Sequence, residues 1–438
     1  DIRVISFSGQ MMGCLCVDRT GNPLRKSLIY SDQRAQKQTD YLRESIDGNE
    51  FYHITGTRIN PSYSIEKLMW VAENEPEIYK RTFKLLQAKD FIAFRLTGRF
   101  ATDYNDAGGT SAFNITEKCW SSNILKIAGI EEDKFPEVVP SIEVLGETKG
   151  PFIEEAGLPC GIPVVIGSGD GGAATVGAGS IKPYSAYNYI GSSSWISVTS
   201  EKPFFDERQS IFNWVHPVPG YYQPCGSMQT AGSSYEWLKN QVLLNKHGDF
   251  DEDVYSTLDR LILNSKPLSN GTLFLPYMMG ERTPWWDPDV KGAFLGLNLA
   301  TSFSDMVRSV VEGICFNLNI IKNIYQEEFS FKEMTVFGGM AGSEVFLQIL
   351  ADITGMNLNI LQHKEEATSM GAAVIGGVGA GVFRDFSVIN DFISVSQTVN
   401  PDPVRVQEYS VGSGLLEIAY EALIGFNKKL ADMQAKQR

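Results

Sequence analysis

The sequence contains few of the residues that build metal sites and disulfide frameworks. It has six cysteines and four histidines in 438 residues. No two cysteines form a CxxC pair, and the histidines lie far from the cysteines along the chain. A metal site made of cysteine and histidine is therefore not expected, and a disulfide framework is disfavoured in a chain of this length. The pattern favours reduced, mostly buried thiols in a cytoplasmic protein.

Positive charge is also scarce. The chain has 38 Lys and Arg residues against 52 Asp and Glu residues, a formal net charge of -14. A field of this sign repels phosphate backbones, so nucleic acid is not an expected partner, although a small anionic substrate in a locally basic cleft remains possible. The 43% of hydrophobic and 21% of charged residues are ordinary for a globular protein, and the length allows two or three domains.

Long apolar runs are nearly absent. No signal-peptide pattern opens the chain, and one uncharged run, residues 367–383, nearly reaches membrane-spanning length but is rich in glycine. This run predicts a close-packed internal helix followed by a glycine-rich turn, so no membrane partner is expected. The chain opens at Asp1 directly in a strand-like segment, from which we expect that an N-terminal segment of the natural protein precedes it.

Common motifs for nucleotides and nucleophiles are missing as well. The sequence has no GxxxxGK[ST] loop, and no GxGxxG opens a helix that is followed by a ribose-binding acid. The segment "GSSSW" lacks the GxSxG form of a nucleophile elbow, which disfavours an acyl hydrolase. The sequence does not exclude a glycosyl hydrolase with two catalytic carboxylates, but nothing in it indicates such a pair.

Four strand-like segments end instead in glycine and hydroxyl residues. Successive backbone N–H groups that are not shielded by a Cβ form concavities that bind anions. One such turn is usually plain turn chemistry, but four at the ends of apolar strands favour a nucleotide-type cleft. The segments are residues 6–13 ("SFSGQMMG"), 167–172 ("GSGDGG"), 189–195 ("YIGSSSW") and 336–344 ("VFGGMAGSE").

Asp170 stands alone among glycines at the end of one of these strands. It could cap the following helix by accepting hydrogen bonds from the N–H groups of Gly172 or Ala173. It could instead act as a general base, since the glycines leave room for a substrate hydroxyl. The residue pattern alone leaves both roles open and favours the cap.

Strand-like and helix-like segments alternate along the chain. The patterns "IRVISFSG" and "IPVVIGSG" predict buried strands, residues 14–32 predict a hairpin, and residues 64–97 predict a long helical region that ends at Gly98. A strand-rich pattern restarts after residue 184. We therefore expect an α/β protein with two related domains, residues 1–184 and 185–438, and a cleft between them.

Two long segments resemble the FGGY family of carbohydrate kinases. Residues 62–74, "SYSIEKLMWVAEN", have the family's spaced serine, Lys67, Trp70 and acidic-amide ending. Residues 292–312, "GAFLGLNLATSFSDMVRSVVE", have its glycine-containing opening and its acidic helix with Asp305 and Glu312. The resemblance covers essentially the whole chain and implies an actin-like, ribonuclease H-like ATPase fold, with a sugar-binding domain in residues 1–184 and a nucleotide-binding domain in residues 185–438.

The resemblance also implies an activity and a set of site residues. It implies ATP-dependent phosphorylation of a terminal hydroxyl of a small sugar or polyol, with Asp170 as the catalytic base. Mg²⁺ would bridge the phosphates, mostly coordinated by water, with no dedicated metal ligands from the protein. Family members often form homodimers. The expected sugar contacts are Gln10, Met11, Met12, Asp170 and Gly171, and the expected nucleotide contacts are Gly191, Ser192, Ser193, Gly232, Glu236, Gly338, Gly339 and Ser343.

The chain departs from the xylulose kinases that it otherwise resembles most. Those kinases typically have histidine where this chain has Met12 and asparagine where it has Gly171. The sugar pocket would therefore lack two hydrogen-bonding groups. The candidate substrates are D-xylulose, gluconate, another ketopentose, or a deoxy sugar with an apolar carbon near Met12. A non-catalytic sugar-sensing relative is a further alternative, because the family's Asp-Gly-Thr phosphate loop would lie before Asp1.

Overall fold

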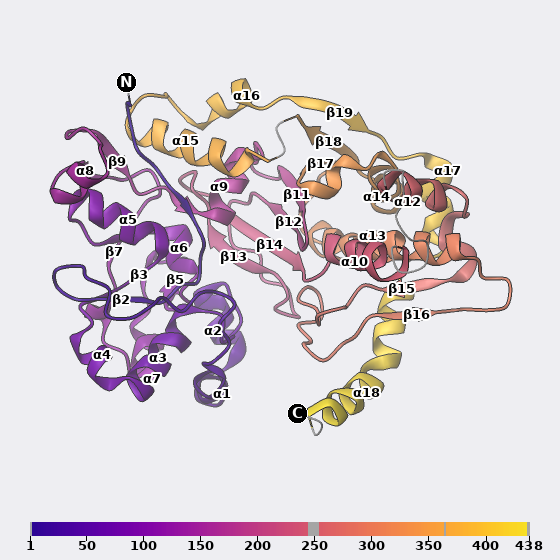
Figure 1. Cartoon of the computed structure of the whole chain (residues 1–438), viewed down its shortest axis with the longest axis horizontal. Coiled ribbons are helices and arrows are strands. Elements are labelled where there is room, and N and C mark those ends of the chain that lie inside the picture. The colour runs from indigo at the N-terminus through magenta and orange to yellow at the C-terminus, as the bar shows by residue number, and fades with distance from the viewer. Residues whose placement is uncertain (1, 244–253, 363–364, 436–438) are drawn as a thin grey trace. The chain divides into compact units, whose positions relative to one another are not determined.

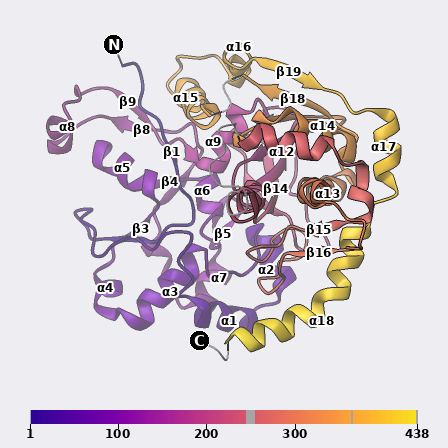
Figure 2. The same cartoon turned by 45° about the vertical axis from the view of Figure 1, so that its right-hand side comes forward.

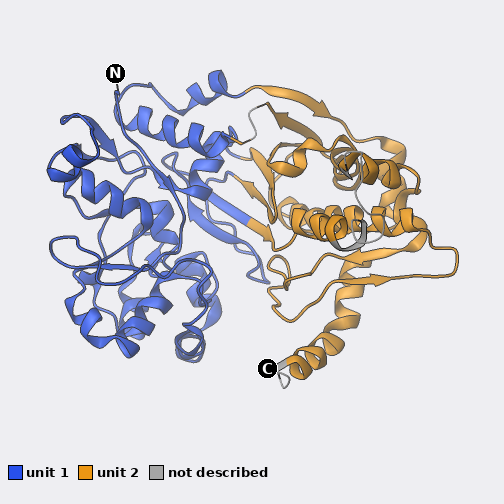
Figure 3. Ribbon diagram, viewed as in Figure 1, with its two compact units in different colours: residues 1–183, 199–225, 366–393 blue, residues 184–198, 226–365, 394–438 orange. Residues whose placement is uncertain are grey.

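The computed structural model describes residues 2–243, 254–362 and 365–435, which form two compact units (Figure 3). Unit 1 comprises residues 1–183, 199–225 and 366–393, and unit 2 comprises residues 184–198, 226–365 and 394–438. Both units mix helices and strands, as Figure 1 labels them. Each unit therefore collects segments that lie far apart in the sequence.

In unit 1, two of the glycine turns leave neighbouring strands. Strand β1 (Ser8–Gly9) pairs in parallel with β10 (Ser168–Gly169), and Gly9 lies opposite Gly169. Because the strands are parallel and in this register, the "QMM" and "DGG" segments follow them at the same edge. The other strand pairs of unit 1 are β2 (Leu15–Val17) with β3 (Lys84–Leu86), β4 (Ala101–Asp103) with β7 (Glu137–Val139), β5 (Phe113–Asn114) with β6 (Cys119–Trp120), β8 (Val144–Glu147) with β9 (Pro163–Val165), and β13 (Phe212–Val215) with β14 (Tyr222–Met228).

The prediction of one long helical region over residues 64–97 is wrong in its middle. Helix α3 (Ser64–Asn74) ends just before Pro76, which starts α4 (Pro76–Arg81), and β3 separates α4 from α5 (Ala88–Thr97). Proline fits the first turn of a helix but cannot continue one, and β3 is held by its pairing with β2. Gly98 ends α5 in the left-handed conformation, with φ of 80°, as predicted.

The prediction of a hairpin over residues 14–32 is confirmed in part. The turn is closed by the N–H of Asp18, which donates to the carbonyl of Asn22 (3.0 Å), and Cys14 and Leu28 exchange two backbone hydrogen bonds. The returning segment forms only isolated bridges, however, and β2 pairs along its length with β3. Pro23 lies opposite Val17 and has no N–H to donate to a ladder.

The glycine-rich run of residues 367–383 forms the close-packed helix that the sequence predicts. Helix α15 (Ala367–Gly379) lies against α9 (Asp170–Gly177), as Figures 1 and 2 show. A Cβ on Gly371 would lie 1.9 Å from the carbonyl oxygen of Ala173, so only glycine allows this approach. A pocket of about 630 Å³ lies between α15 and the segment around β1. Within the described residues, no helix is long and apolar enough to cross a bilayer.

Unit 1 contains further α-helices. They are α1 (Gln36–Ser45), α2 (Gly48–Thr55), α6 (Tyr104–Gly108), α7 (Ser122–Ala128), α8 (Pro151–Glu155) and α16 (Ile389–Phe392). Helices α1, α3 and α7 contribute to one apolar core with β2 and β3, which includes buried Leu42, Leu68 and Leu125. Of the six cysteines, Cys14, Cys16, Cys225 and Cys315 are buried, and Cys119 and Cys160 are exposed.

Unit 2 is built around five strands in the order β12-β11-β17-β18-β19. The first two form an antiparallel hairpin, β17 and β18 follow in parallel, and β19 is antiparallel. The strands are β11 (Ala186–Ile190), β12 (Ser194–Val198), β17 (Glu333–Phe337), β18 (Asn357–Leu361) and β19 (Val395–Val399). The other elements are α10 (Gly232–Trp237), α12 (Val254–Leu263), β15 (Leu273–Leu275), β16 (Ala293–Leu295), α13 (Phe303–Gln326), α14 (Glu344–Thr354), α17 (Pro403–Ser410) and α18 (Leu415–Ala435).

Candidate active site

Asp170 is the first residue of α9 and follows β10 directly. Its side chain is exposed to solvent, and Oδ1 accepts a hydrogen bond from the N–H of the next residue, Gly171 (2.8 Å). The N-cap position belongs to Gly169, and no side chain caps this helix. The alternative role as a helix cap, with bonds to Gly172 or Ala173, is therefore wrong. The carboxylate remains open to a ligand.

The protein around Asp170 changes its proton affinity. Partial desolvation raises the pKa of the carboxyl above its ordinary value, while the N–H groups of Gly171 and of Asp170 itself oppose this effect. A general base works best when its pKa lies near the pH of the reaction. The upward shift therefore suits a carboxylate that accepts a proton.

The two glycines that flank Asp170 are each covered by an apolar side chain. A Cβ on Gly169 would lie 2.5 Å from Cγ of Met11, and a Cβ on Gly171 would lie 3.1 Å from Cζ3 of Trp214. The space beside both glycines is thus filled by protein, and glycine is required at position 169 because a side chain would collide with the thioether. A thioether and an indole thus pack against the residues before and after Asp170.

The "GQMM" loop lies next to the Asp170 turn because β1 and β10 are paired. Gln10 and Asp170 each follow one member of the Gly9–Gly169 pair. Gln10 is exposed, Met11 is buried and Met12 is half-buried. Met12 has a φ of 63°, a left-handed conformation that is unfavourable for a residue with a long side chain. The loop must therefore be held in place by its surroundings.

Three buried side chains hold this loop. The ammonium of Lys67 donates to the carbonyl of Met12 (2.9 Å), and the hydroxyl of Ser64 donates to the carbonyl of Gly13 (2.6 Å). The N–H of Gly13 donates to Oε1 of Gln87 (2.6 Å). Lys67 and Ser64 belong to α3, within the segment that carries the first family resemblance. That segment therefore positions the backbone of the expected sugar contacts.

A buried ion cluster lies beneath the same loop. The ammonium of Lys89 lies 2.7, 2.9 and 3.3 Å from carboxylate oxygens of Asp90, Asp103 and Asp106. Although burial alone would lower it, the three carboxylates raise the pKa of Lys89 above its ordinary value. Cβ of Lys89 is 3.0 Å from the position that a Cβ of Gly9 would take. The cluster thus packs directly under β1 and fixes its end.

The sequence patterns did not point to the polar side chains beside Gly171. The Nδ2 group of Asn105 donates to the carbonyl of Val215 (2.9 Å) and to Oε1 of Gln223 (3.3 Å). The Nε2 group of Gln223 donates in turn to the carbonyl of Gly171 (3.1 Å). Two single amides more than a hundred residues apart form no motif, so only the tertiary structure reveals that they orient the Asp170 turn.

In unit 2, the structure brings three glycine segments together. The carbonyl of Gly191 accepts a hydrogen bond from the N–H of Gly232 (2.9 Å), and the carbonyl of Ser192 accepts one from the N–H of Ser233 (3.0 Å). A Cβ on Gly338 would lie 2.6 Å from the carbonyl oxygen of Ile190, so this backbone also packs tightly on the end of β11. The turns after β11 and β17 and the start of α10 therefore form one closely packed cluster of backbone.

The other expected nucleotide contacts lie around this cluster. Ser192 is exposed, and Ser193 accepts the N–H of Gly191 at its carbonyl (2.9 Å). No atom lies within 4 Å of a Cβ built on Gly339. Glu236 is exposed on α10. Ser343 caps α14 by accepting the N–H of Phe346 (3.1 Å), so a structural role already accounts for its hydroxyl.

Comparisons with known proteins found similar sequences and a similar fold. Two models of the FGGY family of carbohydrate kinases match, the N-terminal domain over residues 1–177 and the C-terminal domain over residues 186–380. The chain is 32% identical to a xylulose kinase of Staphylococcus epidermidis, over 98% of this chain and 84% of that protein. It is 28% identical to a gluconokinase of Bacillus subtilis, over 93% and 80%. Its fold matches a ligand-bound xylulose kinase from Lactobacillus acidophilus with a TM-score of 0.91 and 24% identity, over 98% of this chain and 86% of that chain.

Proposed function

Because the chain belongs to the FGGY family of carbohydrate kinases, we propose that it transfers the γ-phosphoryl group of ATP to a terminal hydroxyl of a small open-chain sugar or polyol. Its fold is the two-domain actin-like, ribonuclease H-like ATPase fold, and kinases of this family use ATP as a substrate. The observation that carries the proposal is that the carboxylate of Asp170, at the end of β10, is exposed and does not cap helix α9.

The leading candidate substrate is a ketopentose such as D-xylulose, and gluconate is the second. Relatives with both names match the chain at similar identity, 32% for the xylulose kinase and 28% for the gluconokinase. We assign the sugar to the domain of residues 1–184, where Gln10, Met11, Met12, Asp170 and Gly171 would contact it. The register of β1 against β10 supports this assignment because it places both segments at one edge.

Asp170 would act as the general base of the transfer. It accepts the proton of the attacking hydroxyl while the sugar oxygen forms its bond to the γ-phosphorus. The bond between that phosphorus and the bridging oxygen of ADP breaks, and ADP leaves with the electron pair. Phosphoryl transfer depends mainly on positioning and on neutralising charge, so the carboxylate's fixed place on a helix start is as important as its basicity.

The nucleotide would bind the backbone cluster of unit 2, in the domain of residues 185–438. Backbone N–H groups at glycine turns suit phosphate oxygens, and the expected contacts are Gly191, Ser192, Ser193, Gly232, Glu236, Gly338, Gly339 and Ser343. Among the residues that the structure describes, no group of three or more His, Cys, Asp or Glu residues is arranged to hold a metal ion. Mg²⁺ would be held mostly by the phosphates and water, and it would neutralise phosphate charge.

The Asp170→Asn variant tests this proposal. It keeps the size of the side chain but removes the base, so kcat for the best sugar should fall by about 10²–10⁴-fold, the usual contribution of a general base. The matched control is Asp47→Asn, which changes the exposed N-cap of α2 to another good cap. Turnover of Asp170→Asn within a few-fold of the wild type would overturn the assignment.

Two further proposals concern the setting of the reaction. We place the kinase in the cytoplasm, where ATP is available and its thiols stay reduced. We also propose a homodimer, which size-exclusion chromatography with light scattering would detect as twice the mass of one chain.

A further inference from the structure

The amide side chains of Asn105 and Gln223, next to Gly171, are occupied within the protein. The amide of Asn105 donates to Val215 and Gln223, and the amide of Gln223 donates to Gly171. Oδ1 of Asn105 has no partner among the described residues, but it is fully buried. The polar side chains next to Gly171 are thus committed to the protein or shielded from a ligand.

Trp214 is the residue that lies directly against Gly171. It belongs to β13, and only 8% of its surface is exposed. A Cβ on Gly171 would lie 3.1 Å from Cζ3 and 3.6 Å from Cε3 of the indole, and a Cβ on Gly108 would lie 3.0 Å from Cδ1. The indole is therefore wedged between two glycines on different helices, α6 and α9. A side chain at either position would press on it.

The orientation of the indole decides what it offers beside Asp170. The atoms that face Gly171, Cε3 and Cζ3, are carbons on the edge of the ring opposite the nitrogen. Nε1 lies on the Gly108 side, 3.9 Å from the position of a Cβ there, and it is buried without a hydrogen-bond partner among the described residues. The indole wall that packs on Gly171, the residue after Asp170, is therefore made of carbon there and offers no donor or acceptor.

We infer that Trp214 is a specificity-determining residue that selects a substrate with a deoxy carbon, CH₂ or CH₃, where the substrate meets this wall. The inference rests on the proposed function, since it assumes that the sugar binds beside Asp170. Met11, packed on Gly169, makes the opposite wall apolar as well. A hydroxyl pressed against either surface would lose its hydrogen bonds to water without replacement.

The test is a kinase assay with matched substrates. The panel contains D-xylulose, D-ribulose and D-gluconate together with their single-deoxy analogues, one for each hydroxyl-bearing carbon except the phosphorylated one. One deoxy analogue should have a kcat/KM about 10–100-fold higher than its parent, the usual size of discrimination by an apolar wall. The difference should reside mainly in KM. If every parent sugar is better than all of its deoxy analogues, the inference is overturned.

Variants of Trp214 test whether the indole itself causes the preference for the deoxy analogue. Trp214→Phe keeps a carbon surface and should keep the preference for the deoxy analogue within about threefold. Trp214→Gln places an amide there and should abolish or reverse the preference. Trp285→Phe, an aromatic change in unit 2 where the ring stacks on Tyr420, is the matched control and should leave the preference unchanged. An unchanged preference in Trp214→Gln would overturn the inference.

Circular dichroism would show whether Trp214→Gln is folded. If it is not, a second variant tests the same inference. Gly171→Ser adds a polar side chain against the indole, whose Cβ alone requires a few tenths of an ångström of adjustment, and should lower the preference. Calorimetric titration with each sugar accompanies the assay. If the wild type neither binds nor phosphorylates any sugar of the panel, the proposed function fails and the inference with it. Turnover with no deoxy preference defeats the inference alone.

Discussion

The two segments that resemble the family most closely perform the same structural task with charges of opposite sign. In unit 1, the ammonium of Lys67 on α3 holds the carbonyl of Met12, a residue in the left-handed conformation. In unit 2, the carboxylates of Asp305 and Glu312 on α13 hold a turn of left-handed residues. In both places, a buried charged side chain stabilises a backbone shape that most side chains disfavour.

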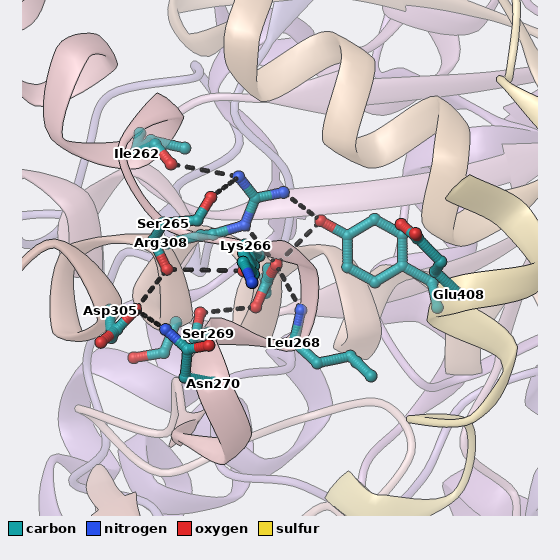
Figure 4. A network of polar contacts seen from close by, with 12 residues as sticks. Ile262, Ser265, Lys266, Leu268, Ser269, Asn270, Asp305, Arg308 and Glu408 are labelled. Carbon is teal, nitrogen blue, oxygen red and sulfur yellow. Dashed lines mark hydrogen bonds and ion pairs between the residues drawn. The ribbon is translucent and has the colours of Figure 1, made fainter. Parts of the chain in front are cut away.

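The turn in unit 2 is the more strained of the two. Leu268, Ser269 and Asn270 have φ values of 64°, 48° and 51° in succession. Glu312 accepts hydrogen bonds from the N–H of Leu268 (3.1 Å) and the hydroxyl of Ser269 (2.6 Å). Asp305 accepts one from the amide of Asn270 (2.7 Å), as Figure 4 shows. Each of the three residues thus has its own hydrogen bond to α13.

The balance of charge differs between the two regions. Glu312 forms an ion pair with Arg308 (2.7 Å), whose guanidinium also donates to the carbonyl of Ser265 and the hydroxyl of Tyr409. Lys67 instead donates to two neutral carbonyl groups, those of Met12 and Ser62. The network of unit 2 is therefore a balanced element of the fold, whereas Lys67 shapes a loop that we place at the sugar. Similar matches to a family pattern can thus serve stability in one region and a site in another.

The largest effect should come from breaking the balanced network. Glu312→Gln leaves the guanidinium of Arg308 buried without its carboxylate, which should lower the free energy of unfolding by about 3–5 kcal/mol. Urea denaturation measures it. The control is Glu408→Gln, which removes an exposed ion pair with Arg405 and should cost less than about 1 kcal/mol. Equal losses in both variants would contradict a structural role for the network.

A smaller loss of stability but a larger loss of activity should follow from Lys67→Met. The carbonyls of Met12 and Ser62 lose their donor, which should cost about 1–3 kcal/mol in unfolding free energy. The loop then shifts, and kcat/KM for the sugar should fall by about 10–100-fold, mainly through KM. Lys37→Met removes an exposed ion pair and is the control. If Lys67→Met keeps the wild-type KM, the two regions do not differ as described.

The smallest effect should be a dependence of stability on pH that arises from the titration of Lys67. Burial lowers the pKa of Lys67 to about 8, below the ordinary lysine value of about 10.4. Between these values the unfolded chain binds the proton more strongly than the folded protein, so stability rises with pH in this window. Relative to Lys67→Met, the wild type should gain on the order of 1 kcal/mol from pH 8 to 10. A flat difference in urea denaturation across this range would show that Lys67 stays charged.

Much of the fold could be predicted because its local signals are strong. Gly98 at the end of α5, the glycine-rich helix over residues 367–379 and the strand before Asp170 all depend on interactions between residues close in sequence. The middle of residues 64–97 could not be predicted, because β3 exists only through its pairing with β2 some seventy residues away. Local propensity does not include such partners.

By itself, the sequence determined the family, the mixed α/β class and the isolation of one carboxylate among glycines. Only the tertiary structure decided that Asp170 is not a helix cap and that its neighbouring glycines are covered by Met11 and Trp214. The physical reason is that a glycine in the sequence shows only that there is no room for a Cβ at that position. What fills that space comes from β13 and the "GQMM" loop, and the folding of distant segments brings them together.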